Sequence, residues 1–288
     1  MLKNYFVVAF RNLVRHKIFS AINIGGLAIG LAAFWMIALY VGNEMSYDNY
    51  HANANRIFRI AQHASWDGGK LNAAVTAAPF GPALKNEYPE VEEMTRFDME
   101  GGGTISYENK RLQVGDILFT DSSVFKIFSY HFLYGDPNTA LAKPHSIVLT
   151  KTLAQKIFGD AADALNKTIV FDRNDGTLVT GVIDDVPLNS HFTFSALRSI
   201  SGGTNDSWSA AYLFTYIMLK EKADVKKLES RLPGFYHKYL EKAFGPGVTY
   251  QMELQPLTSI HLHSNLDYEM APNGKMAYIY IFPFGAIS

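Results

Sequence analysis

The sequence predicts an α+β protein with an N-terminal interfacial helix, one transmembrane helix and a mixed α/β extracytoplasmic domain. Three observations support this fold class. Residues 18–43 are 26 consecutive positions without a charged side chain, a basic amphipathic segment precedes them, and strand-like and helix-like patterns are interspersed after Glu44.

The uncharged stretch is long enough to cross a membrane. A helix needs roughly 20 apolar residues to span the hydrocarbon core, and residues 18–41 exceed that length. The competing interpretation is a signal peptide, whose apolar part usually has only about 7 to 15 residues and ends at a small-residue cleavage site. Because the stretch ends in residues 39–43 (Leu-Tyr-Val-Gly-Asn) without such a site, an uncleaved span is favoured.

The charges on either side of the span predict its orientation. Glu44 and Asp48 follow the span before the next arginine, Arg56, whereas four basic side chains precede it. These four are Lys3, Arg11, Arg15 and Lys17. The positive-inside rule therefore places the N-terminus in the cytoplasm, and the chain after about residue 43 outside the cytoplasm.

The first 17 residues combine apolar side chains at helical spacing with a basic polar complement, which predicts a helix along the cytoplasmic surface of the membrane. A bend near Ser20, Asn23 or the Gly25-Gly26 pair would separate this helix from the span. The alternative is one continuous helix over residues 1–40, with the glycines serving close helix packing. We favour the bent arrangement.

The chain after Glu44 has the composition of a soluble mixed domain. Alternating apolar residues predict strands over residues 56–63, 104–107, 112–119, 145–149, 168–171, 178–183, 212–219 and 248–254. Helical spacing predicts helices over residues 76–88, 122–128, 151–158 and 225–242. Because hairpin-like turns lie between these elements, α+β is favoured over a doubly wound parallel sheet.

The composition excludes several classes of partner and site. With 26 Lys and Arg against 27 Asp and Glu, the formal net charge is -1, and no basic tract is present that would bind nucleic acid. The absence of cysteine excludes disulfides, cysteine-ligated zinc, iron–sulfur clusters and thiol nucleophiles.

One group of side chains has the residue types of a metal site. His261 and His263 lie near Glu253, Asp267 and Glu269 in the sequence, and a strand would place both imidazoles on one face. The spacing fixes no third ligand, so a structural boundary is the favoured interpretation and we assign no metal ligand.

A second group, Asp184 and Asp185 with His191, could pair a base with a carboxylate. Residues 187–190 between them are typical of a turn with local side-chain caps, which favours a structural role. We therefore assign no catalytic or cofactor-binding residue and expect no enzymatic activity in this chain.

Several short blocks along the chain carry a family resemblance. They are Tyr47 to His51, Asn53 to Arg59, Asp121 to Phe125, Phe128-Ser129, Gly135-Asp136-Pro137, Ala140-Leu141, Pro144, Ser146 to Thr150, Phe158-Gly159, Gly181 to Phe192 and Leu254 to Leu262. In this order they resemble ABC transporter permeases of the MacB/FtsX-like class, particularly the versions abundant in Bacteroidetes. The first two resemble the membrane exit of these permeases, and the likeness runs from Met1 to the end of the chain.

The resemblance implies a domain organisation. A cytoplasmic-face amphipathic helix would occupy residues 1–17, a transmembrane helix residues 18–43, and a MacB-like periplasmic core domain with two α/β lobes residues 44–275. Residues 276–288 look like the start of a second span, and their 13 positions are fewer than the roughly 17 needed to cross. The expectation is a permease that is truncated in this second span.

The resemblance also implies partners. These are an ATP-binding cassette subunit that hydrolyses ATP, a second permease copy, membrane lipids and, in efflux systems, a periplasmic adaptor and an outer-membrane channel. No cofactor is implied. Arg11, Arg15 and Lys17 are the candidate coupling or lipid-facing residues, because they lie at the predicted cytoplasmic face.

Two functions remain open at this stage. In the first, the chain is the N-terminal part of a permease that couples ATP hydrolysis by a partner to movement of the extracytoplasmic domain, for efflux or export. In the second, it is a membrane-anchored binding or sensor module, or a permease fragment without transport activity. The sequence does not identify a transported substrate.

Overall fold

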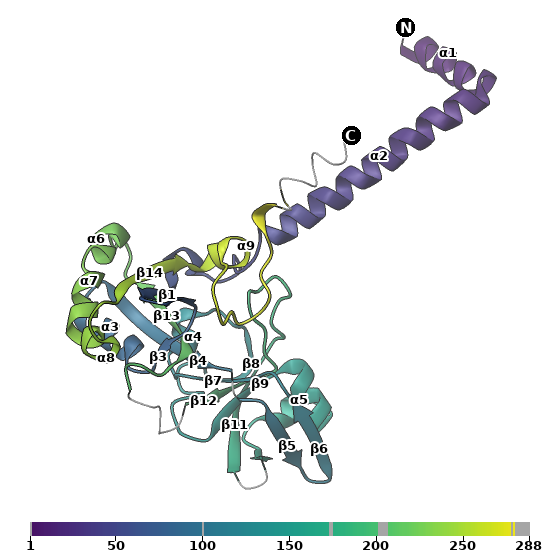
Figure 1. Cartoon of the computed structure of the whole chain (residues 1–288). Coiled ribbons are helices and arrows are strands. Elements are labelled where there is room, and N and C mark those ends of the chain that lie inside the picture. Colours follow the sequence, from purple (N-terminus) through teal and green to yellow (C-terminus); the bar gives the residue numbers. More distant parts are fainter. Residues whose placement is uncertain (1, 100, 173–174, 201–206, 278, 280–288) are drawn as a thin grey trace. The chain divides into compact units, whose positions relative to one another are not determined.

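A computed structural model describes residues 2–99, 101–172, 175–200, 207–277 and 279 of the chain (Figure 1). The chain divides into two compact units. One contains helices α1 (Leu2–Arg15) and α2 (Lys17–Glu44), and the other is Ser46–Gly274. Each unit is described separately.

The first unit bends between its two helices. His16 adopts φ -110° and ψ 54°, outside the helical region, so α1 ends at Arg15 and α2 begins at Lys17. The predicted bend is therefore confirmed, but its predicted position at Ser20 to Gly26 is wrong, because Gly25 and Gly26 lie inside α2. The break falls instead where the amphipathic pattern gives way to the uniformly apolar one.

Helix α2 has the length of a membrane span. Its 28 residues extend about 42 Å, against about 30 Å for a hydrocarbon core. None of its described side chains is buried. Among the described residues it is the one helix that is long and apolar enough to cross a membrane.

The second unit contains a 14-stranded mixed sheet among the described residues. Its strands are β1 (Ile57–Trp66), β2 (Gly69–Ala73), β3 (Thr76–Ala77), β4 (Val91–Asp98), β5 (Gly103–Tyr107), β6 (Lys110–Val114), β7 (Ile117–Thr120), β8 (Phe132–Gly135), β9 (Ser146–Thr150), β10 (Thr168–Phe171), β11 (Asp175–Ile183), β12 (Ala196–Ser199), β13 (Ala211–Leu219) and β14 (Thr249–Pro256). The main path runs β14-β1-β13-β4-β7-β12-β9-β11-β10-β5-β6, with β2, β3 and β8 attached to β1, β13 and β11. The pairs β9–β11 and β7–β12 are parallel and the other pairs are antiparallel.

Helices gather at the two ends of this sheet (Figure 1). Four helices accompany β14 and β1: α3 (Phe80–Glu87), α6 (Val225–Glu229), α7 (Leu232–Phe235) and α8 (Glu241–Phe244). At the other end lie β5, β6 and α5 (Lys151–Phe158). Short helices complete the unit: α4 (Val124–Ile127), α9 (Ile260–His263), the 3-10 turns Ala54–Arg56, Ala161–Ala164 and Leu257–Ser259, and the π-helix Tyr236–Leu240.

Three apolar clusters form the core of the unit. One lies under the helices beside β14 and includes Phe80, Leu84 and Phe235. A second, the distal core, lies around α5, β9 and β11 and includes Ile147, Leu149, Leu153, Ile157 and Val179. Between them, the central core packs Phe97, Phe128, Phe192 and Tyr216 mostly edge to face, with Phe97 to Phe128 centroids 5.6 Å apart. The predicted α+β class is confirmed.

The predicted elements agree with the structure in part. Residues 151–158 and 168–171 form α5 and β10 as predicted. The predicted strand over 112–119 is instead two strands, β6 and β7, because the chain turns at Gly115-Asp116. The predicted helix over 225–242 is interrupted, since α6 ends at Glu229, a new helix begins at Leu232 with Pro233 in its first turn, and a π-helix follows. The predicted helix over 76–88 begins only at Phe80, as α3, because Thr76 and Ala77 form the strand β3. Strands β2, β3, β4, β8 and β12 were not predicted from the sequence.

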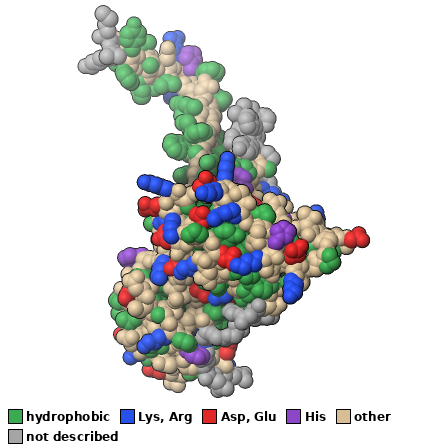
Figure 2. Space-filling view, turned by 90° about the vertical axis from the view of Figure 1, so that its left-hand side faces the viewer, with side chains coloured by type: hydrophobic (Ala, Val, Ile, Leu, Met, Phe, Trp, Pro, Cys, Tyr) green, Lys and Arg blue, Asp and Glu red, His purple; other side chains and the backbone are tan. Residues whose placement is uncertain are grey.

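The surface of the second unit is mixed in charge. Figure 2 shows acidic and basic side chains intermixed over the visible face of this unit, in keeping with the near-zero net charge of the chain. No broad basic face is visible there that would attract a polyanion.

Candidate functional site

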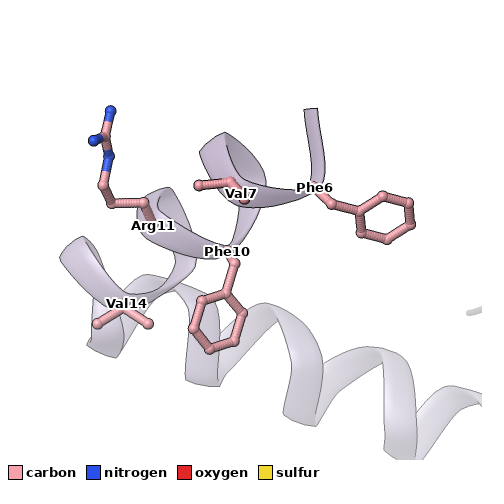
Figure 3. Close-up of a pocket in the computed structure, with 5 residues that line it drawn as sticks. All are labelled: Phe6, Val7, Phe10, Arg11 and Val14. Atoms are coloured by element: carbon pink, nitrogen blue, oxygen red, sulfur yellow. The ribbon is translucent and has the colours of Figure 1, made fainter. Parts of the chain in front are cut away.

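The predicted coupling residues lie on or beside α1. Arg11, Arg15 and Lys17 are all exposed. Four apolar side chains form a strip along the helix, and Arg11 lines the same shallow hollow; the strip consists of Phe6, Val7, Phe10 and Val14. Figure 3 shows the Arg11 guanidinium pointing away from Phe10 and Val14, which is the segregation of an amphipathic helix.

The predicted histidine pair does not lie on a strand. His261 and His263 belong to the helix α9, where residues two apart point in different directions, and His261 is buried whereas His263 is exposed. The His261 ring stacks on Tyr47 with centroids 3.4 Å apart. No group of three or more potential metal-ligating side chains is found in the described part of the chain.

The acidic neighbours of this pair have other partners. Glu253 accepts from His63 at 2.7 Å, and Glu269 accepts from Arg59 at 2.6 Å. Asp267 pairs through its backbone with Asn72 and Ala74 beside β2. The strand geometry on which the metal hypothesis depended is therefore wrong, because the local backbone is helical.

The second predicted group is also separated by the fold. Asp184 lies 2.8 Å from His131, and Asp185 accepts from the backbone N–H and the hydroxyl of Thr152 at the start of α5. His191 instead contacts Asp48, 143 positions earlier in the chain. The three residues thus serve three different contacts.

The structure instead brings together residues of the segment that follows α2. This exit segment, residues 46–53, folds into the second unit with Asp48 fully buried. Asp48 has φ 60°, a left-handed conformation in which Asp is among the tolerated residues. Its backbone N–H donates to the Asn189 carbonyl at 2.9 Å, while the Asn189 side chain donates to the Ser46 hydroxyl at 3.0 Å. The segment is thereby held against residues 189–191.

The Asp48 carboxylate is the centre of this contact. Oδ1 accepts from the Ser190 hydroxyl and the His191 backbone N–H, both at 3.2 Å. Oδ2 lies 2.9 Å from His191 Nδ1, an ion-pair distance without the alignment of a hydrogen bond. On its other side His191 Nε2 lies 2.7 Å from the Tyr216 hydroxyl on the central strand β13. Asp48 is thus connected to the middle of the sheet.

A second histidine belongs to the same cluster. His51 is 3% exposed, and its Nδ1 accepts from the Ser129 backbone N–H at 3.0 Å. Tyr50 shares a 3.0 Å hydrogen bond with Ser190, and the rings of His51 and Tyr130 meet edge to face. Burial lowers the pKa of His51 to about 4, against the opposing effect of Asp48, and burial raises the pKa of Tyr50. Both groups are therefore neutral at pH 7.

The segment before residue 275 is fixed by a separate ion pair. This return segment, residues 264–274, contains Glu269. Its carboxylate accepts hydrogen bonds from both Nη groups of the fully buried Arg59 on β1, at 2.6 and 3.1 Å. Gln255 and Ser264 also accept from Arg59. Burial opposes ionisation of Glu269, but Arg59 outweighs it and holds the pKa of the carboxyl below its usual value.

Tyr216 joins the two segments. Its hydroxyl contacts His191 and donates to the Met270 sulfur at 3.3 Å. Together with the stacking of Tyr47 on His261, this contact makes the exit and return segments part of one buried network, which we call the junction cluster: Asp48, Tyr50, His51, Arg59, Ser190, His191, Tyr216, Glu269 and Met270. These contacts fix two chain segments rather than position a nucleophile beside a base.

Sequence reasoning did not identify the junction cluster as a site. Asp48, His51 and His191 lie in the blocks that carry the family resemblance, but the sequence does not show that two blocks 143 positions apart meet. The sequence feature that could have indicated the cluster is the presence of ionisable side chains in blocks that are otherwise apolar or turn-forming.

Known proteins share this architecture. The model of the MacB-like periplasmic core domain matches residues 20–234. A domain ascribed to a permease protein from Porphyromonas gingivalis is 19% identical in sequence, with a TM-score of 0.64. The match covers 80% of this chain and 98% of the chain of that domain. This likeness supports the fold.

Two further solved structures are more distant. The periplasmic region of MacB from Actinobacillus actinomycetemcomitans has 12% identity and a TM-score of 0.47, covering 70% of this chain and 89% of its own. The extracellular domain of the noncanonic ABC-type transporter YknZ from Gram-positive bacteria has 14% identity and a TM-score of 0.46, covering 68% and 99%. No curated protein matches the sequence. Since the family model spans well over half of the chain, the chain belongs to the MacB-like periplasmic core domain family of ABC-type transporter permeases.

Proposed function

We propose that the chain is the permease component of an ABC transporter, in which a partner subunit hydrolyses ATP in the cytoplasm and the Ser46–Gly274 unit moves outside the membrane, for efflux or export. The observation that carries this proposal is the match of residues 20–234 to the MacB-like periplasmic core domain. In this arrangement residues 1–17 lie at the cytoplasmic face, residues 18–43 span the membrane and residues 44–275 are extracytoplasmic.

The junction cluster supports a mechanical role for the second unit. A displacement of the chain at Ser46 would act on Asp48 and, through His191 and Tyr216, on β13 in the middle of the sheet. Asp48, His191 and Tyr216 are all buried, so from Asp48 onward the path passes through closely packed side chains that would absorb little of the movement. The exit segment therefore suits the transmission of force better than the binding of a ligand.

Helix α1 is our candidate for the contact with the ATP-binding subunit. The energy source is cytoplasmic, and α1 presents exposed arginines on the predicted cytoplasmic side. Arg11, Arg15 and Lys17 would also hold the orientation of the span, since each basic residue near an anionic lipid surface contributes about 1 kcal/mol. A second permease copy, and in efflux a periplasmic adaptor with an outer-membrane channel, would complete the assembly.

The test is the charge-preserving double variant Arg11→Lys with Arg15→Lys, in the permease reconstituted with its ATP-binding subunit in proteoliposomes. Lipid attraction depends on charge, whereas bidentate pairing with a carboxylate needs a guanidinium group. We expect normal insertion and a loss of at least about threefold in the stimulation of ATP hydrolysis.

The matched control is Arg111→Lys on the exposed strand β6, which should leave stimulation unchanged. A double variant that stimulates its partner as the parent does would show that these arginines serve only lipid attraction. A permease that never alters the ATPase rate would favour the membrane-anchored binding module instead.

A further inference from the structure

Leu188 is the most exposed large apolar side chain of the described part of the Ser46–Gly274 unit. It is 91% exposed, whereas Tyr268 is 69% exposed and the remaining large apolar side chains there are below half. Single exposed apolar residues are common on protein surfaces. Leu188 is distinguished by what its loop contacts.

The loop that carries Leu188 forms hydrogen bonds with the exit segment. Asn189, its neighbour, donates from its side chain to the Ser46 carbonyl at 3.3 Å and to the Ser46 hydroxyl at 3.0 Å, and its own carbonyl accepts from Asp48. Ser190 and His191 then bond Asp48. Leu188 is therefore the immediate chain neighbour of residues that hydrogen-bond to Ser46 and Asp48.

Chain connectivity limits how far Ser46 lies from the end of α2. Glu44 is the last residue of α2, and two residues extend at most about 7 Å. Helix α2 is about 42 Å long, and a bilayer with its headgroup regions is about 40–45 Å thick. If α2 spans, Ser46 lies at the outer headgroup region, and a tilted helix brings it closer to the hydrocarbon core.

We propose that Leu188 is a membrane anchor of the second unit and inserts into the outer lipid surface beside the point where the chain leaves the membrane. A leucine at this depth transfers its side chain from water to the boundary of the acyl chains. The anchor would hold residues 187–189, and with them Ser46 and Asp48, at a fixed height. This inference rests on α2 being a span, as in the proposed function, but not on ATP hydrolysis or transport.

The absence of cysteine from the chain makes a direct test possible. Single cysteines at Leu188, Leu178 and Leu31 are labelled with an environment-sensitive fluorophore in the full chain. The protein is reconstituted in phosphatidylcholine vesicles with or without a lipid that carries a doxyl quencher near the headgroup end of its acyl chain. Iodide added outside reports exposure to water.

Leu178 is the matched control for Leu188. It is also a leucine, it is 38% exposed, and it lies on β11 five residues before Ile183, or about 16 Å along the strand. Leu31, in the middle of α2, tests the span itself. We expect the lipid quencher to reduce fluorescence at position 188 at least about twofold more than at position 178, with weak iodide quenching at 188.

Each other result overturns the proposal. Equal and weak lipid quenching at positions 188 and 178, with strong iodide quenching at both, would place Leu188 in water. Protection of position 188 from both quenchers would indicate a protein contact, with a second copy or another partner. Absence of lipid quenching at position 31 would remove the span on which the proposed topology also rests, whereas quenching at 31 but not at 188 contradicts the anchor alone.

Discussion

Two buried arginines show how the central region of the Ser46–Gly274 unit differs from its distal region. Arg59, beside the return segment, forms a bidentate ion pair with Glu269 and bonds Gln255 and Ser264. Arg198, beside the distal core, places its guanidinium over the rings of Phe171 and Phe119, at 4.4 and 5.2 Å from their centroids. Burial lowers the pKa of Arg198.

The difference shows where the fold uses directional contacts. Hydrogen bonds between charged groups define one geometry, whereas contacts between a guanidinium and aromatic rings tolerate sliding. The central arginine fixes a segment that lies next to the boundary of the unit, while the distal arginine lies over two aromatic rings and is also attracted by the charge of Asp172. The central region is therefore expected to be the more sensitive to loss of a single charge.

The largest expected effect tests this comparison directly. Glu269→Ala leaves Arg59 fully buried without its carboxylate, which costs about 3–5 kcal/mol in the free energy of unfolding. Because about 1 kcal/mol shifts the melting temperature by about 2–4 °C in a domain of this size, the full chain in detergent should melt at least about 6 °C lower by circular dichroism.

The control for this variant lies in the distal region. Arg198→Met keeps an apolar side chain between Phe171 and Phe119 and removes the charge itself, together with its cation–π contacts and its attraction to Asp172. Because no buried ion is left without its partner, we expect a smaller loss of stability than in Glu269→Ala. If Arg198→Met lowered the melting temperature as much as Glu269→Ala, the two regions would not differ in the way we describe.

The second prediction concerns acid and the exit segment. The folded pKa of His51, about 4, lies below its unfolded value of about 6.5, so the unfolded chain binds more protons between these values. The contribution of His51 is fully present above pH 6.5 and is lost as the pH falls towards 4. Between pH 7.5 and pH 5 this group should remove about 2 kcal/mol of stability.

The variant His51→Gln should remove this part of the pH dependence, measured as the difference in melting temperature between pH 7.5 and pH 5. Its control is His237→Gln, since the His237 side chain is 65% exposed and pairs with Glu241 four residues later. An unchanged pH dependence in His51→Gln would mean that His51 is not the buried neutral group we describe.

The sequence predicted the architecture better than the site. Regular patterns sufficed for α2, α5 and β10, because an apolar run or a short amphipathic repeat determines such elements locally. Strand β4 was missed because two glutamates interrupt its pattern. From the sequence alone, a charged residue at such a position favours a loop. In the fold, Glu93 lies on β4 and its charge is compensated by Lys85 and Lys126.

The junction cluster could not be predicted for a different reason. The alternation of β1 suggests one polar face, yet both faces of its first six residues are buried and Arg59 is compensated by Glu269, 210 positions away. Likewise, the contact between Asp48 and His191 forms only in the tertiary fold. Local spacing carries no information about such distant pairs. The candidate sites predicted from the sequence were therefore groups of histidines and acidic residues that lie close together along the chain.

The smallest expected effect compares two adjacent aspartates at the edge of the distal region. Asp185 accepts from the Thr152 backbone N–H at 3.0 Å and from its hydroxyl at 2.6 Å, so it satisfies a free donor in the first turn of α5 and interacts favourably with the positive end of that helix. Removing such a cap by Asp185→Ala should cost about 1 kcal/mol, a fall of about 2–4 °C in melting temperature.

Asp184 is the control for this variant. It contacts His131 at 2.8 Å, but the two side chains are 49% and 75% exposed, so Asp184→Ala should cost less than about 0.5 kcal/mol. Thermal unfolding of both variants and the parent at pH 7.5 would measure the difference, and an Asp184→Ala variant at least as destabilised as Asp185→Ala would contradict the assignment of Asp185 as the cap that joins residues 184–191 to the distal region.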